Sequence, residues 1–481
     1  MKIKDQSPFL TILCFFLLFP KLYAQEFSNT IELKLPVHSL TEHFSLIDKS
    51  GHIHYVYKLY DHVRHLEFDE DLTLLNDSEY NNTIISQQKI IGYEATDKGQ
   101  IRIYVSTNNK RNFTVLTLFE NTLNIANIDL KLKGEKPIKT INYNNNFYLL
   151  SINKGSSTIN VYIFDGKYIE KKVYPFNTEV FLNWNNDVLP LSEVITKQNV
   201  EFIEPNIPLP IEQTSSPIKI YPNKDNLILT LNHRREETKI LALNLSDSSS
   251  KVKTIAMPNL KLTEANARRV NSFIFQNKLF QVSAAPKAMS FQITNIESLE
   301  NISHYSFTED EPIPFKNSPI YQEANLLSND KTKEIEKTKK FLRKISNTDL
   351  GIAVYQTNNI LNISIGGTKE LNTDANGIVT AGILFGAIGA AVYASISSTS
   401  RTYDLYTNSK SVYVKSLFSA QSFQNIDGKA SKNSFDKIRD YIHKQDLKRT
   451  NFGNIIKNNH GFIFSYYLKK NKQLTLVKFE L

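Results

Sequence analysis

The sequence predicts an all-β protein, a β-propeller of about seven antiparallel blades with helical insertions, on three observations. Short runs with alternating Ile, Val, Tyr and Phe recur along the chain, which is the period-two pattern of half-buried strands. Asn-Asn, Lys-Gly and similar pairs separate these runs, and such residues tolerate the positive φ of tight hairpin turns. Turn landmarks such as Gly51, Gly99 and Asn145 lie about 46–52 residues apart where nothing intervenes, a spacing typical of propeller blades.

One repeated unit carries the prediction. It reads FSLIDKSGHIHYVYKLY at 44–60, IIGYEATDKGQIRIYVST at 90–107 and INYNNNFYLLSINKGSSTINVYIFDG at 141–166, and further copies begin at 218, 271, 350 and 454. The strand IELKLPV at 31–37 and the terminal QLTLVKFEL are expected to pair and close the ring, which would remove two exposed sheet edges. Tandem β-sandwiches are the alternative, but they would show linkers about every hundred residues. Only 203–217, with four prolines, resembles such a linker.

The N-terminus predicts export. The basic MKIK, the apolar FLTILCFFLLF and the small Ala24 follow the order of a secretory signal peptide over residues 1–24. The one cysteine, Cys14, lies inside it, so disulfides and thiol chemistry are excluded from the mature chain. We expect a periplasmic, outer-membrane-associated or secreted protein. Residues 25–481 would form a single propeller domain.

Insertions are expected where the repeat spacing widens, at about 167–217, 299–348 and 368–453. Two of them contain predicted helices. The helix at 331–346 places Ile335, Leu342 and Ile345 on one face, and the helix at 434–444 aligns Phe435, Ile438 and Ile442. On the first helix a basic stripe could dock on an anionic partner, although such stripes are usually solvated. The stripe consists of Lys333, Lys337, Lys340 and Lys344.

Several strings resemble those of a known group of proteins. They are the YAQ that ends the signal peptide, EKTKKFLRKIS in the first helix, ISIGG before a Gly-rich apolar insertion, and SVYVKSLF after it. With them the chain resembles exported propeller-like proteins of Bacteroidota, mainly over residues 331–481. The resemblance implies an envelope or secreted location, and it brings no activity and no site residues with it.

The most apolar run of the mature chain is GIVTAGILFGAIGAAVYASIS at 377–397. Its length and lack of charge would suit a membrane span, and Gly382, Gly386 and Gly389 form a small-residue stripe that permits close helix packing. A span would separate the last repeat from the others by a membrane, however, which favours an insertion packed within a soluble ring. A self-associating or membrane-contacting helix is the second interpretation, and a true span is the third.

The charge and the motifs limit the candidate functions. A net charge of +9 is spread along the chain, so we expect no nucleic-acid partner. No nucleophile elbow, phosphate-binding glycine loop or zinc-protease helix is present, and we expect no cofactor. Histidines concentrate near the N-terminus, where His52, His54, His62 and His65 could hold a metal with nearby carboxylates. Because their spacing fits no standard ligand pattern, ordinary strand and turn histidines are the preferred interpretation.

These observations favour a non-enzymatic, exported β-propeller that acts as a binding scaffold for a protein or envelope partner. One alternative is a propeller hydrolase or lyase acting on a glycan or peptide. Another is a membrane-associated assembly component that uses 377–397. Ionisable side chains from several blades that converge at one funnel mouth would indicate the enzyme, and a shallow apolar surface would indicate the scaffold.

Overall fold

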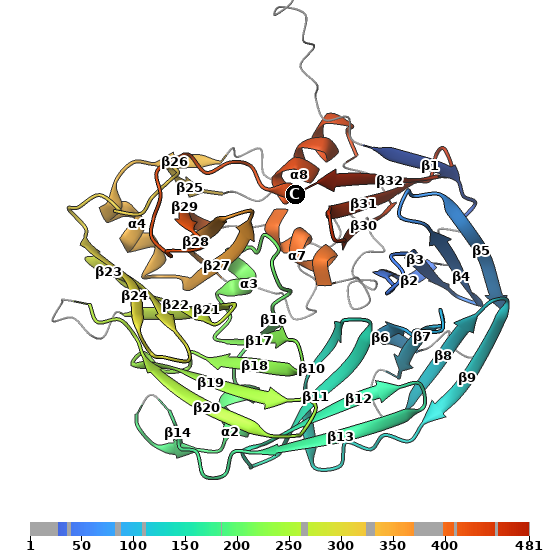
Figure 1. The fold of residues 1–481 in the computed structure, drawn as a ribbon, viewed down its shortest axis with the longest axis horizontal. Helices are drawn as coiled ribbons and strands as arrows, with labels where there is room; N and C mark the ends of the chain where they lie inside the picture. Colours follow the sequence, from blue (N-terminus) through green and yellow to red (C-terminus); the bar gives the residue numbers. More distant parts are fainter. Residues whose placement is uncertain are drawn as a thin grey trace, which may run out of the picture.

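Seven β-sheets of four or five strands form a ring in the part of the chain that the structure describes (Figure 1). The structure is a computed structural model. It describes residues 27–35, 40–81, 88–107, 112–183, 185–260, 268–323, 332–369, 398–407, 411–447 and 451–480. The sheets follow one another around the ring in chain order, with neighbouring strands almost all antiparallel. The predicted β-propeller of about seven antiparallel blades is therefore confirmed.

The first four blades run from residue 40 to residue 256. Blade 1 is β2 (Leu40–Ile47), β3 (Ile53–Leu59), β4 (His62–Phe68) and β5 (Leu74–Asn81). Blade 2 is β6 (Lys89–Ala95), β7 (Ile101–Ser106), β8 (Phe113–Phe119) and β9 (Thr122–Ile128). Blade 3 is β10 (Glu135–Tyr143), β11 (Asn146–Asn153), β12 (Thr158–Asp165) and β13 (Tyr168–Pro175). Blade 4 is β16 (Val200–Phe202), β17 (Ile218–Asn223), β18 (Asn226–Leu231), β19 (Glu237–Asn244) and β20 (Ser250–Ala256), and the pair β14 (Phe181–Leu182) and β15 (Val188–Leu189) precedes it.

The last three blades complete the ring. Blade 5 is β21 (Arg269–Phe275), β22 (Lys278–Ala285), β23 (Ala288–Asn295) and β24 (Asn301–Thr308). Blade 6 is β25 (Ile320–Gln322), β26 (Lys333–Ile335), β27 (Asp349–Thr357), β28 (Ile360–Thr368) and β29 (Ser411–Ser419). Blade 7 is β30 (Asn451–Lys457), β31 (Gly461–Leu468) and β32 (Gln473–Glu480), joined by β1 (Ser28–Glu32).

The hairpin turns form where the turn residues predicted them. Between β10 and β11, Asn144 and Asn145 adopt φ of 48° and 57°, and Tyr143 pairs with Asn146 across the turn. Two successive positive φ values match the right-handed twist of the flanking strands, which is why asparagine suits this position. The same local chemistry sets the register of both strands.

The two ends of the chain close the ring. β1 pairs antiparallel with β32, with Ser28 opposite Val477 and Glu32 opposite Gln473. A hydroxyl hydrogen bond of 3.0 Å joins Thr30 and Thr475 across this pair. The predicted terminal pairing is confirmed, although the N-terminal strand lies at 28–32 instead of 31–37.

Neighbouring blades pack through aromatic side chains. Phe44 of blade 1 stacks on Tyr93 of blade 2 with ring centroids 4.3 Å apart. Phe147 of blade 3 lies against Gly92 of blade 2 so closely that a Cβ on this glycine would lie 2.1 Å from the ring. Glycine at position 92 therefore sets how near blades 2 and 3 can approach.

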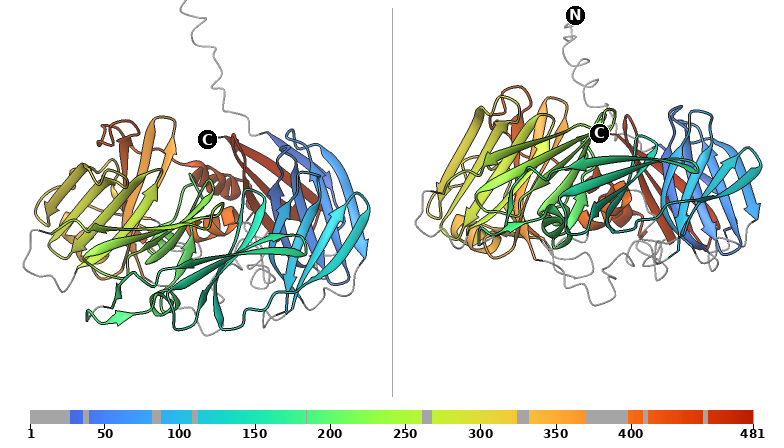
Figure 2. Two further views of the ribbon diagram at one scale, coloured as in Figure 1. Left: turned by 60° about the horizontal axis from the view of Figure 1, so that its bottom comes forward. Right: turned by 90° about the horizontal axis from the view of Figure 1, so that it is seen from below.

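The helices α7 (Ser398–Thr407) and α8 (Ser434–Lys444) lie between blades 6 and 7 (Figures 1 and 2). Phe435 of α8 contacts Phe462 of blade 7 edge-on, with centroids 5.2 Å apart, and Tyr403 of α7 contacts Phe435 at the same centroid distance. Both helices therefore belong to the core. The other described helices are α2 (Leu191–Thr196), which contacts blade 3, α3 (Ile211–Thr214), which contacts blade 6, and α4 (Thr338–Ile345), which contacts blades 5 and 6.

The predicted helix at 331–346 is only partly correct. Lys333 lies in β26, where Ile335 pairs with Ile320 of β25, and Lys337 is the N-cap of α4. Of the basic stripe, Lys340 and Lys344 lie on the helix. The helix was predicted to start too early because Ile335 has helical spacing to Leu342 and Ile345. Ile335 is in fact buried by strand pairing in β26, whereas Phe341, Leu342 and Ile345 form the apolar face of α4. The helix predicted at 434–444 is confirmed.

The predicted insertions also hold blade strands. The three ranges 167–217, 299–348 and 368–453 contain the strands β13, β24 and β29, respectively. β13 was not counted as part of a repeat because the charged residues Glu170, Lys171 and Lys172 interrupt its apolar residues, so this outer strand lacks an apolar run.

Two predicted segments lie outside the described residues. The signal peptide at 1–24 and the apolar run at 377–397, with Gly382, Gly386 and Gly389, are among the ranges that the structure does not describe. Among the described helices, none has the length and the apolar character that crossing a bilayer requires.

Candidate functional site

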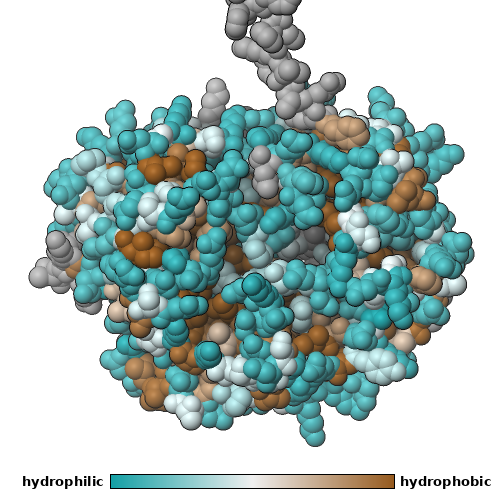
Figure 3. Space-filling model, viewed as in Figure 1, coloured by the Kyte–Doolittle hydropathy of each residue, from teal (hydrophilic) through white to brown (hydrophobic). Residues whose placement is uncertain are grey.

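A wide cavity opens at the centre of the ring. It holds about 2220 Å³ of empty space, including the part open to solvent, and its walls come from blades 1, 2, 3, 4 and 7 and from α7. We call it the funnel mouth. Its lining includes Asp48, Glu204, Lys457 and His460, so ionisable side chains from several blades do converge there. The face seen in Figure 3 is largely hydrophilic, with apolar side chains in separate groups.

Polar contacts at the funnel mouth hold the start of α7. Glu204 accepts hydrogen bonds from Ser398 Oγ at 2.7 Å and from Thr399 Oγ1 at 2.8 Å. Lys457 donates to the Pro205 carbonyl at 2.7 Å, and burial lowers the pKa of its ammonium although the charge of Glu204 opposes this. Glu204 and Lys457 therefore form hydrogen bonds within the protein, and those of Glu204 hold the start of α7 in place.

A second, smaller cavity lies between blade 6 and the helices α7 and α8. We call it the inter-blade pocket. It contains about 550 Å³ of empty space, including the part open to solvent. The residues used below that line it are Glu323, Tyr406, Tyr413, Lys415 and Asn433.

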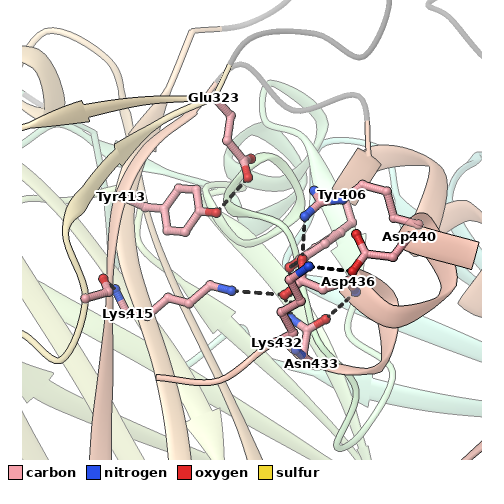
Figure 4. A network of polar contacts seen from close by, with 10 residues as sticks. Glu323, Tyr406, Tyr413, Lys415, Lys432, Asn433, Asp436 and Asp440 are labelled. Carbon is pink, nitrogen blue, oxygen red and sulfur yellow. Dashed lines mark hydrogen bonds and ion pairs between the residues drawn. The ribbon is translucent and has the colours of Figure 1, made fainter. Parts of the chain in front are cut away.

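Strand pairing in blade 6 places Glu323, Tyr413 and Lys415. Glu323 directly follows β25, and its backbone N–H donates to the Ser411 carbonyl at 3.0 Å. Tyr413 and Lys415 are two residues apart on β29, so both side chains leave the same face of the sheet. Tyr413 donates its phenol hydrogen to Glu323 Oε1 at 2.7 Å (Figure 4).

Gly366 permits this arrangement. It pairs with Tyr413 across β28 and β29, and a Cβ at position 366 would lie 2.5 Å from the Tyr413 Cβ. This glycine belongs to the ISIGG string, so the string has a structural role beside the pocket.

Asp436 organises the helical side of the pocket (Figure 4). It accepts from Tyr406 at 2.9 Å, Arg439 at 2.7 Å and Lys415 at 3.2 Å. Its carboxylate also accepts from the Asn433 backbone N–H, while the Asn433 side chain accepts from the Asp436 N–H. This reciprocal pair is a capping box, which satisfies N–H groups at the start of α8.

The two carboxyl groups have opposite shifts in pKa. Burial raises the pKa of Glu323, and the negative charge of Glu212 adds to the rise, against the hydrogen bond from Tyr413 and the charge of Arg439. Burial also acts on Asp436, but the charges of Lys415 and Arg439 outweigh it and lower the pKa of Asp436. Carboxyl groups whose environments separate their pKa values are typical of acid–base sites.

The tyrosines in the pocket are not nucleophiles. Burial raises the pKa of Tyr406 well above its ordinary value, and the charge of Asp436 adds to this effect. Burial together with the charge of Glu323 does the same to the pKa of Tyr413. A nucleophilic phenolate needs the opposite shift. The pocket can therefore donate and accept protons at Glu323 and place a positive charge at Lys415.

The predicted metal candidates do not assemble into one site. His54 Nδ1 lies 2.9 Å from His65 Nε2, whereas His52 contacts Glu67 at 2.8 Å and His62 contacts Asp61 at 2.7 Å. Within the described ranges no group of three or more potential ligands comes together. The four histidines lie in two adjacent strands and their turns, and they form separate pairs.

Sequence reasoning did not find the inter-blade pocket. Glu323 and Tyr413 are separated by 90 positions, and neither lies in a recognisable motif. The one sequence pattern at the pocket is the pair Asn433 and Asp436, which has the spacing of a capping box at the start of the helix predicted at 434–444. That pattern predicts a helix start, and it gives no indication of Lys415 or Glu323.

Comparisons with known proteins found distant structural similarities. No family model matches the chain, and no curated protein matches it. Among solved structures, virginiamycin B lyase from Staphylococcus aureus is similar, with 8% identity and a TM-score of 0.32 over 94% of this chain and 99% of the lyase. Prolyl oligopeptidase B from Galerina marginata is similar over 89% of this chain and 46% of its own, with 7% identity and a TM-score of 0.33.

These findings correct the main functional prediction. The similar structures include those of enzymes, a lyase and an oligopeptidase, which contradicts the non-enzymatic scaffold. Its first alternative, the propeller hydrolase or lyase, is taken up below as a proposal. A likeness at this identity concerns the fold and assigns no substrate or catalytic residue.

Proposed function

We propose that this chain is a propeller enzyme, a hydrolase or lyase, that cleaves a glycan or a peptide by acid–base catalysis at Glu323. The observation that carries the proposal is a glutamate with a raised pKa that lines a cavity together with Lys415. A glutamate with a raised pKa keeps a transferable proton closer to neutral pH than an ordinary carboxyl group.

Glu323 serves the step that both reactions share. Cleavage leaves an oxygen or nitrogen that must gain a proton. Since Tyr413 occupies Oε1, the transferable proton of Glu323 belongs on Oε2. General acid catalysis of this kind contributes about 10²–10⁴-fold to a rate.

Lys415 supplies the positive charge. Its ammonium has three N–H donors, and Asp436 accepts one of them at 3.2 Å. The remaining donors can bind a carboxylate or the negative charge that develops in the transition state. Asp436 does not line the cavity and acts as a positioning residue that holds both Lys415 and Tyr406.

The proposal places the activity outside the cytoplasm, because the sequence predicts a signal peptide at 1–24. Fractionation of cells that express the full chain tests this part. Recovery in the cytoplasm with residues 1–24 still attached would contradict it.

The activity test is a panel of neutral and acidic polysaccharides and of peptides, with product analysis by mass spectrometry. A hydrolase adds one water to its products, whereas a lyase leaves a new carbon–carbon double bond that absorbs in the ultraviolet. We expect cleavage of one class, and a loss of about 10²-fold or more in kcat for Glu323→Gln.

Glu135→Gln is the matched control. That glutamate also accepts from a tyrosine and a lysine, but it lies in blade 3 and does not line the pocket. Its variant should retain kcat at a temperature where circular dichroism shows it folded. Equal activity of wild type and Glu323→Gln, or no cleavage across the panel, would contradict the proposal.

A further inference from the structure

The funnel mouth has room for an extended ligand. Its volume of about 2220 Å³, which includes the part open to solvent, exceeds the range of about 300–1,000 Å³ that is usual for small-molecule pockets. Hairpin turns from three blades line it: 48–51 between β2 and β3, 144–145 between β10 and β11, and 458–460 between β30 and β31. A chain molecule in this space can therefore contact blades 1, 3 and 7 at once.

Two of these turns present side-chain amides that are free to bind. Asn144 and Asn145 lie between β10 and β11, and Asn459 lies between β30 and β31. Asn144 and Asn459 are exposed, and Asn145 is half-buried. None of the three amide groups forms a hydrogen bond with another described residue. Each amide therefore keeps two N–H donors and a carbonyl acceptor for a ligand.

A carboxylate and two aromatic rings complete the set of groups. Glu70 is exposed, and its carboxylate has no partner among the described residues. Tyr93 and Tyr143 are half-buried in the wall. Tyr93 stacks on Phe44 with ring centroids 4.3 Å apart, and Tyr143 packs against the core that blades 3 and 4 share. Tyrosine rings that are held in this way give the cavity apolar surface among its polar groups.

The charges of the lining do not favour an anion. Two histidines can add positive charge: His460 of the lining, and His54, which contacts Asp48 at 3.3 Å. Even with both of them protonated, the positive charges do not outnumber the carboxylates. Lys49 also forms an ion pair with Asp97 at 2.5 Å, and Lys457 donates to the Pro205 carbonyl at 2.7 Å. The lining carboxylates are Asp48, Glu70, Asp71, Glu204 and Glu480, and the lining ammonium groups are Lys49, Lys457 and Lys478.

We propose that the funnel mouth binds a neutral glycan chain. Each hydroxyl group of a sugar both donates and accepts hydrogen bonds, which suits free amides and a free carboxylate. The C–H groups on the faces of a sugar ring pack against tyrosine rings. An acidic glycan would need an excess of cations, which this lining lacks. The funnel mouth shares no lining residue with the inter-blade pocket, so binding there does not depend on catalysis at Glu323.

Calorimetric titration of the full chain with neutral hexasaccharides of glucose, mannose and xylose tests the proposal, with hexagalacturonate and an unstructured peptide as competing ligand classes. Titration of both wild type and Glu323→Gln keeps the result independent of cleavage. We expect saturable binding of at least one neutral hexasaccharide, and a loss of affinity of about tenfold or more for the double variant Asn144→Gly, Asn145→Gly. Glycine adopts the φ of 48° and 57° of this turn without strain. Glu70→Ala should weaken binding as well, and it keeps the test decisive if the double variant does not fold.

Asn358→Gly is the matched control. Asn358 lies in the first hairpin turn of blade 6, between β27 and β28, with a φ of 53°, but it does not line the funnel mouth. Its variant should bind with unchanged affinity. The inference is overturned if no neutral hexasaccharide binds, if hexagalacturonate or the peptide binds more tightly, or if the double variant, Glu70→Ala and wild type bind equally. Binding by a wild type that cleaves nothing would support this inference and contradict the proposed function, so the two results are distinguishable.

Discussion

Blade 3 and blade 6 each contain a glutamate that accepts a hydrogen bond from a tyrosine near a lysine, yet the two carboxyl groups behave in opposite ways. In blade 3 Glu135 accepts from Tyr162 at 2.8 Å and from Lys171 at 2.7 Å, and the pKa of Glu135 is lowered although burial opposes this. In blade 6 the pKa of Glu323 is raised. The same three residue types therefore form a structural ion pair in one blade and a candidate acid in the other.

The difference lies in where the lysine is held. Lys171 contacts Glu135 directly, whereas Lys415 contacts Asp436 and acts on Glu323 only through its charge, so that the hydrogen bond to the Glu323 carboxyl group comes from Tyr413. A positive charge in contact with a carboxylate lowers its pKa strongly, and at greater distance it cannot offset burial. A carboxylate with a lowered pKa stabilises the fold, whereas one with a raised pKa is available for proton transfer.

The largest expected effect on stability comes from removing the charge of Glu135. Glu135→Gln should lower the free energy of unfolding by about 1–3 kcal/mol, because it leaves a lysine and a tyrosine without their charged acceptor. Glu323→Gln should change it by less than about 1 kcal/mol at pH 4.5, since glutamine resembles a protonated glutamate. Urea denaturation of both variants and wild type at that pH measures the contrast. A larger loss for Glu323→Gln would mean that Glu323 is the structural group.

If Lys415 is released from its ion pair with Asp436, the pKa of Glu323 should shift in the direction of the lowered pKa of Glu135. In Asp436→Asn the ammonium loses its charged partner and can turn toward Glu323, so the pKa of Glu323 should fall. The acidic limb of the pH–rate profile would shift to lower pH. Asparagine can still cap α8, and circular dichroism would verify the helix. An unchanged limb would show that Asp436 does not control Glu323.

The pH dependence of stability should differ in sign between the two sites. The lowered pKa of Glu135 gives a stabilisation that is present above the ordinary value of 4.5 and is lost as the pH falls through its folded pKa. The raised pKa of Glu323 gives a stabilisation that is present below 4.5 and is lost as the pH rises through its folded pKa. Melting curves from pH 3 to pH 7 for wild type and each glutamine variant separate the two contributions. If the difference in melting temperature between wild type and variant changed with pH in the same direction for Glu135→Gln and Glu323→Gln, the opposite pKa shifts of the two groups would be contradicted.

The smallest effect is expected from the tyrosines. The hydrogen bond from Tyr413 lowers the pKa of Glu323, so Tyr413→Phe should raise it further. Tyr162→Phe should raise the pKa of Glu135 by a smaller amount, because Lys171 and Ser151 remain as donors. Carbon-13 titration of labelled glutamate reports both values. A fall in either pKa would contradict this interpretation.

The sequence predicted the fold because its determinants are local. Alternating apolar residues and turn asparagines such as Asn144 and Asn145 act on their own strands, so the blades and the closing strand could be found by pattern. The helix at 331–346 was placed too early because Ile335 fits an apolar helix face as well as it fits β26. Pairing with β25 of blade 6 decided that Ile335 lies in a strand and not in the helix.

What the sequence by itself determined is the seven-bladed ring and the pairing of its ends. The tertiary structure decided which carboxyl groups have raised pKa values. The pKa of a buried glutamate depends on its desolvation, its hydrogen bonds and the charges of distant segments. For Glu323 the hydrogen bond comes from Tyr413 and the charges come from Arg439, Glu212 and Lys415. Packing also brought Glu70, Asn145 and Asn459 to the funnel mouth. No local pattern encodes such distances, which is why the sequence indicates the ring and not its sites.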